Sequence, residues 1–334
     1  MNRYILLLSF YMTAIVMIAG DCIAQSSSSA GGLQLRTDSA LAVSYRNQDL
    51  LTYQFNTLYP PKGEDTSYKR SGFIHPLRTL RGHLLTSIQP PDHYHHYGIW
   101  NPWTHTVFEN DTIDFWNLRK KTGTVRFVKF TEKQSAPGHA AYTALHEHIA
   151  FKSDGTEKAA LLEWQTVKVY TPSDKSYIID IISTMQCASG SPLQLLTYRY
   201  GGFSWRAADY WNKNNCEVLT SAGNTRSNTD GSLARWCMAQ GAFPGNEQGG
   251  MVILSHPDNY NHPEPLRIWD ETANDGNGDL FINFSPTKNR DWLLQPGQTY
   301  TLRYRLVVFD GKMTAAKAEE AWQAFAATDK PHSR

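Results

Sequence analysis

The sequence predicts an all-β protein, a large antiparallel β-sandwich with one C-terminal helix. Short runs of alternating apolar and polar residues recur along the chain, and Gly, Pro, Asn and Asp fill the gaps between them. A helical period is nearly absent before the C-terminus. Neither a composition shift nor a linker divides the chain after residue 32, so we expect residues 33–330 to form a single domain.

Period-two alternation marks the expected strands, because successive side chains of a strand point to opposite faces of a sheet. Such runs, separated by turn residues, are typical of a large antiparallel sandwich. The expected strands are 33–36, 40–45, 50–55, 125–130, 141–151, 162–170, 177–185, 193–200, 251–255, 266–269, 280–284 and 300–309.

One segment, residues 313–327, has a helical pattern. It is rich in Ala and carries Trp322 and Phe325 three positions apart. Thr314 is a suitable N-cap. We expect a C-terminal helix that packs on the sandwich.

Residues 1–24 are typical of a secretory signal peptide, with a basic residue at the start, an apolar run and Ala24 before the expected cut. Residues 25–32, rich in Ser and Gly, would then be a flexible lead-in. We therefore expect a periplasmic or secreted protein with no membrane span after removal of the signal. The alternatives are an N-terminal membrane anchor and a lipoprotein modified at Cys22.

Charge and cysteine usage exclude several classes of protein. The formal net charge is +1, so we expect no nucleic-acid partner. Cys187, Cys216 and Cys237 remain after the signal and form no Cys-x-x-Cys pair, which argues against a thiolate metal site. The chain has no P-loop and no dinucleotide-binding Gly-rich turn, and we expect no cofactor.

The stretch from residue 92 to residue 100 is where we expect chemistry, because it holds His93, His95 and His96. Imidazole exchanges protons near neutral pH and binds metals. Two prolines before the stretch and a glycine near its end favour a loop that enters a strand. Three interpretations stay open: acid/base catalysis on a sugar-like substrate, a metal site completed by a distant ligand, and hydrogen-bonded structural histidines.

Two further groups carry polar side chains of chemical interest. His256 and His262 each precede a proline, which stiffens the loop between them. Arg199 lies between two tyrosines and before a Gly-Gly pair, and its guanidinium presents a fixed fork for carboxylates or paired hydroxyls. Histidines in loops and arginines beside aromatic rings are also common without any function, so each group by itself is a weak signal.

An ordered set of motifs resembles one bacterial family, catalogued as "methane oxygenase PmoA" and also treated as a domain of unknown function. The motifs are Asp92-His93-Tyr94-His95-His96-Tyr97-Gly98-Ile99-Trp100, Asp114-Phe115-Trp116, Ser255-His256-Pro257, His262-Pro263 and Leu302-Arg303-Tyr304-Arg305-Leu306-Val307-Val308. The resemblance covers about residues 33–309. Typical members have Arg where this chain has Tyr97, so a guanidinium expected beside the histidines is missing.

The resemblance implies a galactose-mutarotase-like β-supersandwich and a role in carbohydrate breakdown, without naming a substrate. The methane oxygenase name is not carried over as an activity. A particulate methane oxygenase subunit is embedded in a membrane, and no segment after the apolar N-terminus of this chain approaches the length of a span.

The resulting hypothesis is an exported carbohydrate-active protein, with a sugar or glycoside as its partner. The acid/base candidates are His93, His95, His96 and His256. The residues expected to bind the substrate, by stacking or by hydrogen bonds, are Trp100, Trp103, Asp114, Trp116, Arg199 and His262. One alternative is a non-catalytic carbohydrate-binding protein. The other is a metal-dependent enzyme in which His256 or His262 completes the ligand set.

Overall fold

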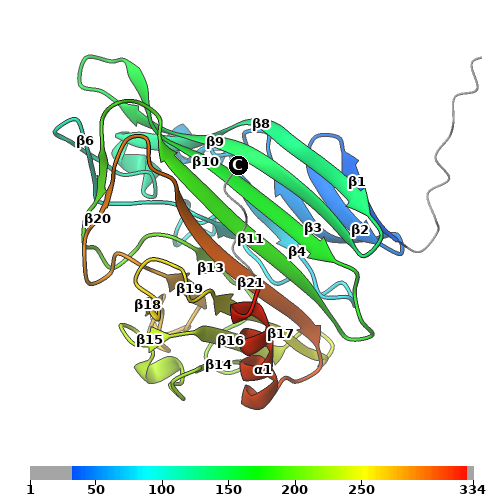
Figure 1. Ribbon diagram of the computed structural model, residues 1–334. Coiled ribbons are helices and arrows are strands. Elements are labelled where there is room, and N and C mark those ends of the chain that lie inside the picture. Colours follow the sequence, from blue (N-terminus) through cyan, green and yellow to red (C-terminus); the bar gives the residue numbers. More distant parts are fainter. Residues whose placement is uncertain (1–31, 329–334) are drawn as a thin grey trace, which may run out of the picture. The chain divides into compact units, whose positions relative to one another are not determined.

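The computed structural model describes residues 32–328. Within this range the strands form three antiparallel sheets and one α-helix follows them, which confirms the predicted all-β class with its C-terminal helix (Figure 1). The predicted signal peptide, residues 1–24, and the predicted lead-in, 25–32, apart from its last residue, lie outside the described residues. None of the described helices is long and apolar enough to cross a membrane.

The first sheet carries the histidine stretch. It has nine strands among the described residues, hydrogen-bonded in the order β1 (Leu33–Thr37), β2 (Leu41–Tyr45), β3 (Gln48–Gln54), β4 (Phe73–Leu77), β5 (Ile99–Trp100), β13 (Ser204–Arg206), β19 (Phe281–Phe284), β18 (Glu264–Ile268) and β15 (Leu233–Ala234). Its middle strands β5 and β13 are only two and three residues long. The loops that these short strands connect therefore come together at the centre of the sheet.

The second sheet contains the long strands that dominate Figure 1. Its eight strands, as far as the chain is described, follow the order β14 (Cys216–Thr220), β16 (Trp236–Ala242), β17 (Gln248–Ser255), β21 (Tyr300–Asp310), β11 (Ser176–Cys187), β10 (Glu157–Tyr170), β9 (His139–Phe151) and β8 (Gly123–Ala136). A four-stranded sheet follows the order β20 (Trp292–Leu294), β12 (Leu193–Leu195), β6 (Thr106–Phe108) and β7 (Asp111–Ile113).

The two large sheets pack face to face and enclose the main core. Alternate residues of β9 and β10 are buried, as the period-two pattern predicted. Tyr53 of β3 contacts Tyr142 of β9 across the interface, with ring centroids 5.0 Å apart. Apolar residues of both sheets belong to one continuous cluster, and their removal from water is the main source of stability.

A buried polar network ties the two sheets together near the histidine stretch. The Glu163 carboxylate accepts hydrogen bonds from the Ser183 hydroxyl at 2.6 Å, the Asn101 amide at 2.8 Å and His148 Nε2 at 3.0 Å. Burial alone would raise the pKa of Glu163, but the bonds to His146 and His148 outweigh it and hold that pKa well below its usual range. Because Asn101 directly follows β5, the network anchors the strand into which the histidine loop runs.

The C-terminal helix α1 (Ala315–Ala326) follows the prediction closely. Thr314 is its N-cap and accepts the backbone N–H of Lys317 at 3.4 Å. Ala318 and Phe325 are buried against an apolar cluster on β16, β17 and β21. Three short 3₁₀ helices occur elsewhere in the described chain, η1 (Thr66–Tyr68), η2 (Leu118–Lys120) and η3 (Arg226–Asn228).

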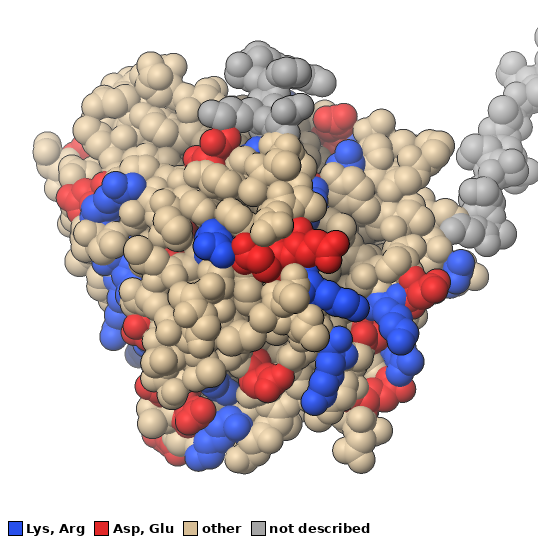
Figure 2. Space-filling view, turned by 60° about the horizontal axis from the view of Figure 1, so that its bottom comes forward, with Lys and Arg blue, Asp and Glu red and all other residues tan. Residues whose placement is uncertain are grey.

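Two features differ from the sequence prediction. The expected strand 193–200 ends at Leu195, and residues 196–200 form a loop. Several strands were not predicted. Some are very short, such as β5, in which two residues show no period, and others are longer, such as β16, whose residues are buried on both faces and so do not alternate. On the face shown in Figure 2, acidic and basic side chains are interspersed, in keeping with the small net charge.

Candidate functional site

The loop that carries the histidines turns back on itself before it enters β5. The His93 N–H donates to the Pro90 carbonyl at 2.9 Å, and the His96 N–H donates to the His93 carbonyl at 3.0 Å. Gly98 adopts a φ of +61° at a place where a Cβ atom would collide with the Ile74 carbonyl oxygen, so glycine is needed there. The loop that was expected from the flanking prolines and glycine is therefore present.

The turn brings all three imidazoles into mutual contact. Ring centroids are 4.8 Å apart for His93 and His96, 5.0 Å for His95 and His96, and 5.3 Å for His93 and His95. All three line a cavity of about 210 Å³. A cavity of about 310 Å³ adjoins it, since His93, Arg199 and Tyr200 line both. We call the two cavities together the histidine pocket.

His93 is held by a buried charge network. Its Nδ1 lies 2.9 Å from an oxygen of Asp92, and the same oxygen accepts a bond from Arg206 at 2.9 Å. Arg206 is 1% exposed and also donates to Asp279 at 2.7 Å. Burial raises the pKa of Asp92, but the bonds from His93 and Arg206 outweigh it, and the net pKa is lowered. Arg206 thus places a guanidinium beside the histidines. The resemblance led us to expect an arginine at position 97 instead, where this chain has Tyr97.

The Asp92 contact decides which nitrogen of His93 carries a proton. An ionised carboxylate can only accept hydrogen bonds, so Nδ1 of His93 is the donor. Nε2 is then the nitrogen left for a ligand.

His95 and His96 are neutral near pH 7. Burial, helped by His93, lowers the pKa of His95 to about 4. Burial, helped by His95, holds the pKa of His96 well below its usual range. The Nδ1 atom of His96 is buried, and no hydrogen-bond partner for it exists among residues 32–328. These two rings can therefore accept and donate neutral hydrogen bonds, as hydroxyl groups require.

Aromatic side chains form part of the wall. Trp116 and Tyr200 line the first cavity and Trp269 lines the second. The Trp269 ring lies 4.6 Å from that of His93, and its indole N–H donates to the Tyr200 hydroxyl at 3.3 Å. Trp116 and Trp269 are 4% and 6% exposed, so they offer ring edges, whereas Tyr200 is half-buried and offers more of its ring.

Two predicted polar residues, Asp114 and Arg199, also line the pocket. The Asp114 carboxylate accepts the backbone N–H groups of Trp116 and Asn117 at 2.9 and 2.8 Å and pairs with Lys120 at 2.8 Å. Much of the hydrogen-bonding capacity of the Asp114 carboxylate is thus used in holding the loop in place. Arg199 is exposed and lies over the ring of the next residue, 5.2 Å from its centroid, without an ion pair to any described residue.

The stacking role predicted for Trp100 and Trp103 does not fit their positions. Each is 1% exposed and neither lines the histidine pocket. Trp103 packs edge-on against Trp292 in the main core, at 6.0 Å between centroids, and Trp100 packs beneath Trp116 at 5.4 Å. Tryptophan is large and apolar, so it fills a core as readily as it forms a binding surface.

His256 and His262 do not join the histidine pocket, contrary to expectation. Neither lines it, and both pack against the C-terminal helix instead. Nε2 of His256 lies 3.0 Å from a guanidinium nitrogen of Arg303, and its ring contacts Phe325. The ring of His262 stacks parallel to Trp322. They lie in the loop that connects β17 of the second sheet to β18 of the first, and this loop packs under α1 rather than beside the histidine loop.

The metal hypothesis required a third ligand from one of these two residues. Within the described part of the chain, no group of three or more His, Cys, Asp or Glu side chains is arranged to hold a metal ion. Cys187, Cys216 and Cys237 are free thiols.

Arg206 and Trp269 complete the site, and neither was predicted from the sequence as a site residue. Asp92 and Arg206 are 114 positions apart, so no local pattern indicates that they pair. For Trp269 a signal did exist. It lies at the end of an expected strand and before a loop rich in Asp, Asn and Gly, which is a common location for a binding residue.

Comparison with family models places the chain in a family without an assigned activity. Residues 40–323 match the model described as "Family of unknown function (DUF6807)", and the chain belongs to this family. The match does not carry the methane oxygenase name of the resemblance noted above. A comparison with curated protein sequences gives no match.

Several solved structures are distantly similar in fold. A heparan sulfate lyase from Pedobacter heparinus is 9% identical with a TM-score of 0.36, over 85% of this chain and 36% of that one. An aldose epimerase homologue from C. elegans is 12% identical with a TM-score of 0.37, over 85% and 100% of the two chains. This chain spans about a third of the length of the lyase. Similarity at this level does not extend to substrate or reaction.

Proposed function

We propose that this protein is an exported carbohydrate-active protein whose histidine pocket binds a sugar, and that His93 transfers a proton on it. The observation that carries the proposal is the imidazole of His93, oriented by Asp92 and lining both cavities of the pocket. Proton transfer by a positioned histidine serves glycoside hydrolysis, β-elimination and epimerisation alike. The proposal therefore names a group and a substrate class but not the bond that reacts.

His93 has the geometry of a general base or acid. Its Nδ1 is bonded to Asp92, which leaves Nε2 to take a proton from the substrate and to return it. The carboxylate of Asp92 is fixed in turn by the buried Arg206, so the imidazole cannot easily rotate. A general base needs this kind of support from a second group.

The rest of the pocket suits a polyhydroxylated ring. The neutral His95 and His96 offer hydrogen bonds to hydroxyl groups, and the exposed guanidinium of Arg199 offers a fork of donors. Tyr200 and Trp269 supply aromatic surface for the C–H face of a sugar. These residues replace Trp100 and Trp103 of the original hypothesis.

The test begins with a panel of neutral, uronic and oxidised oligosaccharides, assayed for binding by calorimetry and for products by mass spectrometry. For a glycan that turns over, we expect His93→Gln to lower turnover by roughly a hundredfold or more and to leave binding within a few-fold, because general acid–base contributions have this size. Tyr200→Ala should instead weaken binding. His139→Gln, a histidine that lines neither cavity, is the matched control.

The outcomes separate the three hypotheses. Binding without any product, unchanged in His93→Gln, would end the enzyme claim and leave a carbohydrate-binding protein. One tightly held zinc or copper ion per chain, lost in His95→Ala, would favour the metal-dependent enzyme. If no glycan of the panel binds, the carbohydrate proposal itself is wrong.

Export is a separate part of the proposal, and it rests on the signal-like residues 1–24. Mass spectrometry of the protein from its native host should find Gln25 at the N-terminus. Recovery of the intact Met1 form, or of a lipid on Cys22, would contradict a soluble periplasmic or secreted protein.

A further inference from the structure

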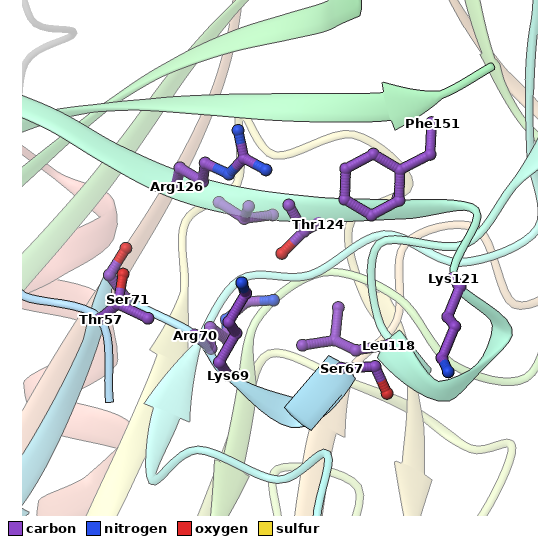
Figure 3. A pocket seen from close by; sticks show the side chains of 12 residues that line it. Thr57, Ser67, Lys69, Arg70, Ser71, Leu118, Lys121, Thr124, Arg126 and Phe151 are labelled. Atoms are coloured by element: carbon purple, nitrogen blue, oxygen red, sulfur yellow. The ribbon is translucent and has the colours of Figure 1, made fainter. Parts of the chain in front are cut away.

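A separate cavity of about 90 Å³ lies beside η1 and η2 (Figure 3). It shares no lining residue with the histidine pocket. Its lining contains the four basic residues Lys69, Arg70, Lys121 and Arg126 and no Asp or Glu. We call it the basic pocket.

Arg70 is the most unusual residue of the basic pocket. It is 2% exposed, yet it forms no ion pair with any described residue. One terminal nitrogen donates to the Phe115 carbonyl at 3.2 Å, the guanidinium lies over the Tyr97 ring, and Nε is buried without a partner within residues 32–328. Burial lowers the pKa of Arg70 to about 10, so it stays protonated near pH 7. A buried cation with an unused donor normally has an anion beside it.

Other hydrogen-bond donors of the basic pocket would also suit an anion. The hydroxyl of Ser67 is buried without a hydrogen bond of normal length, although it lies near enough to Asp65 to help lower the pKa of that carboxyl, and the hydroxyl of Thr124 also lines the cavity. In the view of Figure 3, Arg70 and Arg126 lie on opposite sides of the pocket, with Thr124 between them. Arginine and hydroxyl donors of this kind match the oxygens of an oxyanion.

Not all of the positive charge is available for a ligand. Lys121 pairs with Asp65 at 3.3 Å, and Arg126 forms two bonds of 2.5 and 2.7 Å with Glu157. Both acidic partners lie outside the lining. Arg70 is buried and makes no close ion pair within residues 32–328. The buried Glu163 carboxylate acts on its charge from a distance, but that carboxylate already accepts hydrogen bonds from Ser183, Asn101 and His148.

The size of the cavity restricts the ligand further. At about 90 Å³ it has room for several water molecules and is less than half as large as the first cavity of the histidine pocket. The smaller cavity favours a ligand group smaller than the one that the histidine pocket would hold.

From these observations we propose that the basic pocket binds a small oxyanion, a sulfate or phosphate, held by Arg70 with the Ser67 and Thr124 hydroxyls. The same chemistry fits a free inorganic ion and a sulfate or phosphate substituent on a larger molecule. The proposal does not rest on the function proposed for the histidine pocket.

The test measures binding of sodium sulfate and sodium phosphate to the full chain by calorimetry, at constant ionic strength with chloride as the reference salt. We expect one saturable site, with the affinity lowered at least tenfold in Arg70→Gln, because a charge-assisted bond is lost. Since Arg70→Gln removes a buried residue, Ser67→Ala and Thr124→Val provide variants that remove one hydroxyl each, and a weaker loss is expected in both.

Arg119→Gln is the matched control, because Arg119 is an exposed cation on η2 that lines neither pocket. It should bind the anions as the natural chain does. Absence of saturable binding in the natural chain, or binding that is unchanged in Arg70→Gln, Ser67→Ala and Thr124→Val, would overturn the proposal.

A second arm identifies the source of the anion. A sulfated oligosaccharide and its desulfated counterpart are compared with inorganic sulfate. Tighter binding of the sulfated form, lost in Arg70→Gln, would identify a substituent of a larger molecule as the ligand. Equal binding of inorganic sulfate would identify the free ion. Failure of the glycan panel at the histidine pocket would leave both results unaffected.

Discussion

The histidine pocket and the region around His256 and His262 are built from similar residues but present them differently. We call the latter the C-terminal histidine region. Both have two or more histidines, prolines next to them and tryptophan nearby. The side chain of His93 is 35% exposed, whereas that of His256 is 4% exposed and packs against Phe325 of α1. Burial also varies within each region, since His96 is 1% exposed and His262 is partly exposed, so the two regions differ in what covers His93 and His256.

The comparison shows that a cluster of histidines in a sequence does not by itself indicate an accessible site. In the C-terminal histidine region, α1 lies over the loop after β17, and the Trp322 indole N–H bonds to the Ser255 carbonyl at 2.9 Å. In the histidine pocket the loop packs against the short helix η1, where Tyr68 contacts His95, and the side chains that surround it leave a cavity. Four predictions test this contrast.

The largest effect is expected from the charge network behind His93. Arg206→Met leaves the partly buried carboxylates of Asp92 and Asp279 without their guanidinium, which should lower the free energy of unfolding by about 3–5 kcal/mol. In the C-terminal histidine region, Arg235→Met breaks a partly exposed pair with Glu319 and should cost at most about 1 kcal/mol. Urea denaturation of both variants measures the difference. Equal losses would contradict the buried-network assignment.

A pH-dependent effect is expected from Glu264 in the C-terminal histidine region. Burial raises the pKa of this carboxyl to about 7, although bonds from Ser255, Asn259 and Tyr304 oppose the rise. The unfolded chain releases the proton near its ordinary pKa, well before the folded chain does, so stability should fall as pH rises from about 4.5 to about 7, by roughly 3 kcal/mol. Denaturation curves across this range should show the fall in the natural chain and a smaller one in Glu264→Gln. If the difference in free energy of unfolding between the natural chain and Glu264→Gln does not vary with pH, the pKa of Glu264 is not raised.

In the histidine pocket, stability should change with pH in the opposite direction and fall as the pH is lowered. The pKa of His95 is lowered to about 4, mainly by burial, so the unfolded chain binds the proton first as pH falls. Stability should therefore drop between about pH 6.5 and pH 4, by roughly 2 kcal/mol once partial exposure of the ring is allowed for. His95→Gln should lose less stability than the natural chain over this interval. The exposed His105, changed to Gln, serves as the control. An acid loss in His95→Gln equal to that of the natural chain would show that the pKa of His95 is the same in the folded and unfolded chains.

The smallest effect concerns the helix that covers the C-terminal histidine region. Thr314→Ala removes the N-cap of α1 and should destabilise the protein by about 0.5–1 kcal/mol. Hydrogen exchange of the α1 amides should become faster, while amides of the histidine loop should be unaffected. Faster exchange in both regions would mean that the helix also supports the histidine pocket.

The sequence determined the local structure of this protein. Period-two runs predicted the long strands, because a strand between core and solvent must alternate its side chains. The Ala-rich segment after Thr314 predicted α1, because helix propensity and capping are local properties. The prolines and the glycine around His93 predicted a loop, and a loop was found. Each of these predictions depends on residues close together in the chain.

Only the tertiary structure decided which of these residues meet. Asp92 bonds to Arg206 of the strand β13, and His93 contacts Trp269, the residue that directly follows β18. Trp100 and Trp103 were assigned to a binding surface, but burial in the core accounts for them. Long-range pairing follows from the order of strands in the sheets, and that order arises from the packing of the whole chain. For the same reason, the burial of Arg70 without a close ion pair to any described residue is visible only in the folded protein.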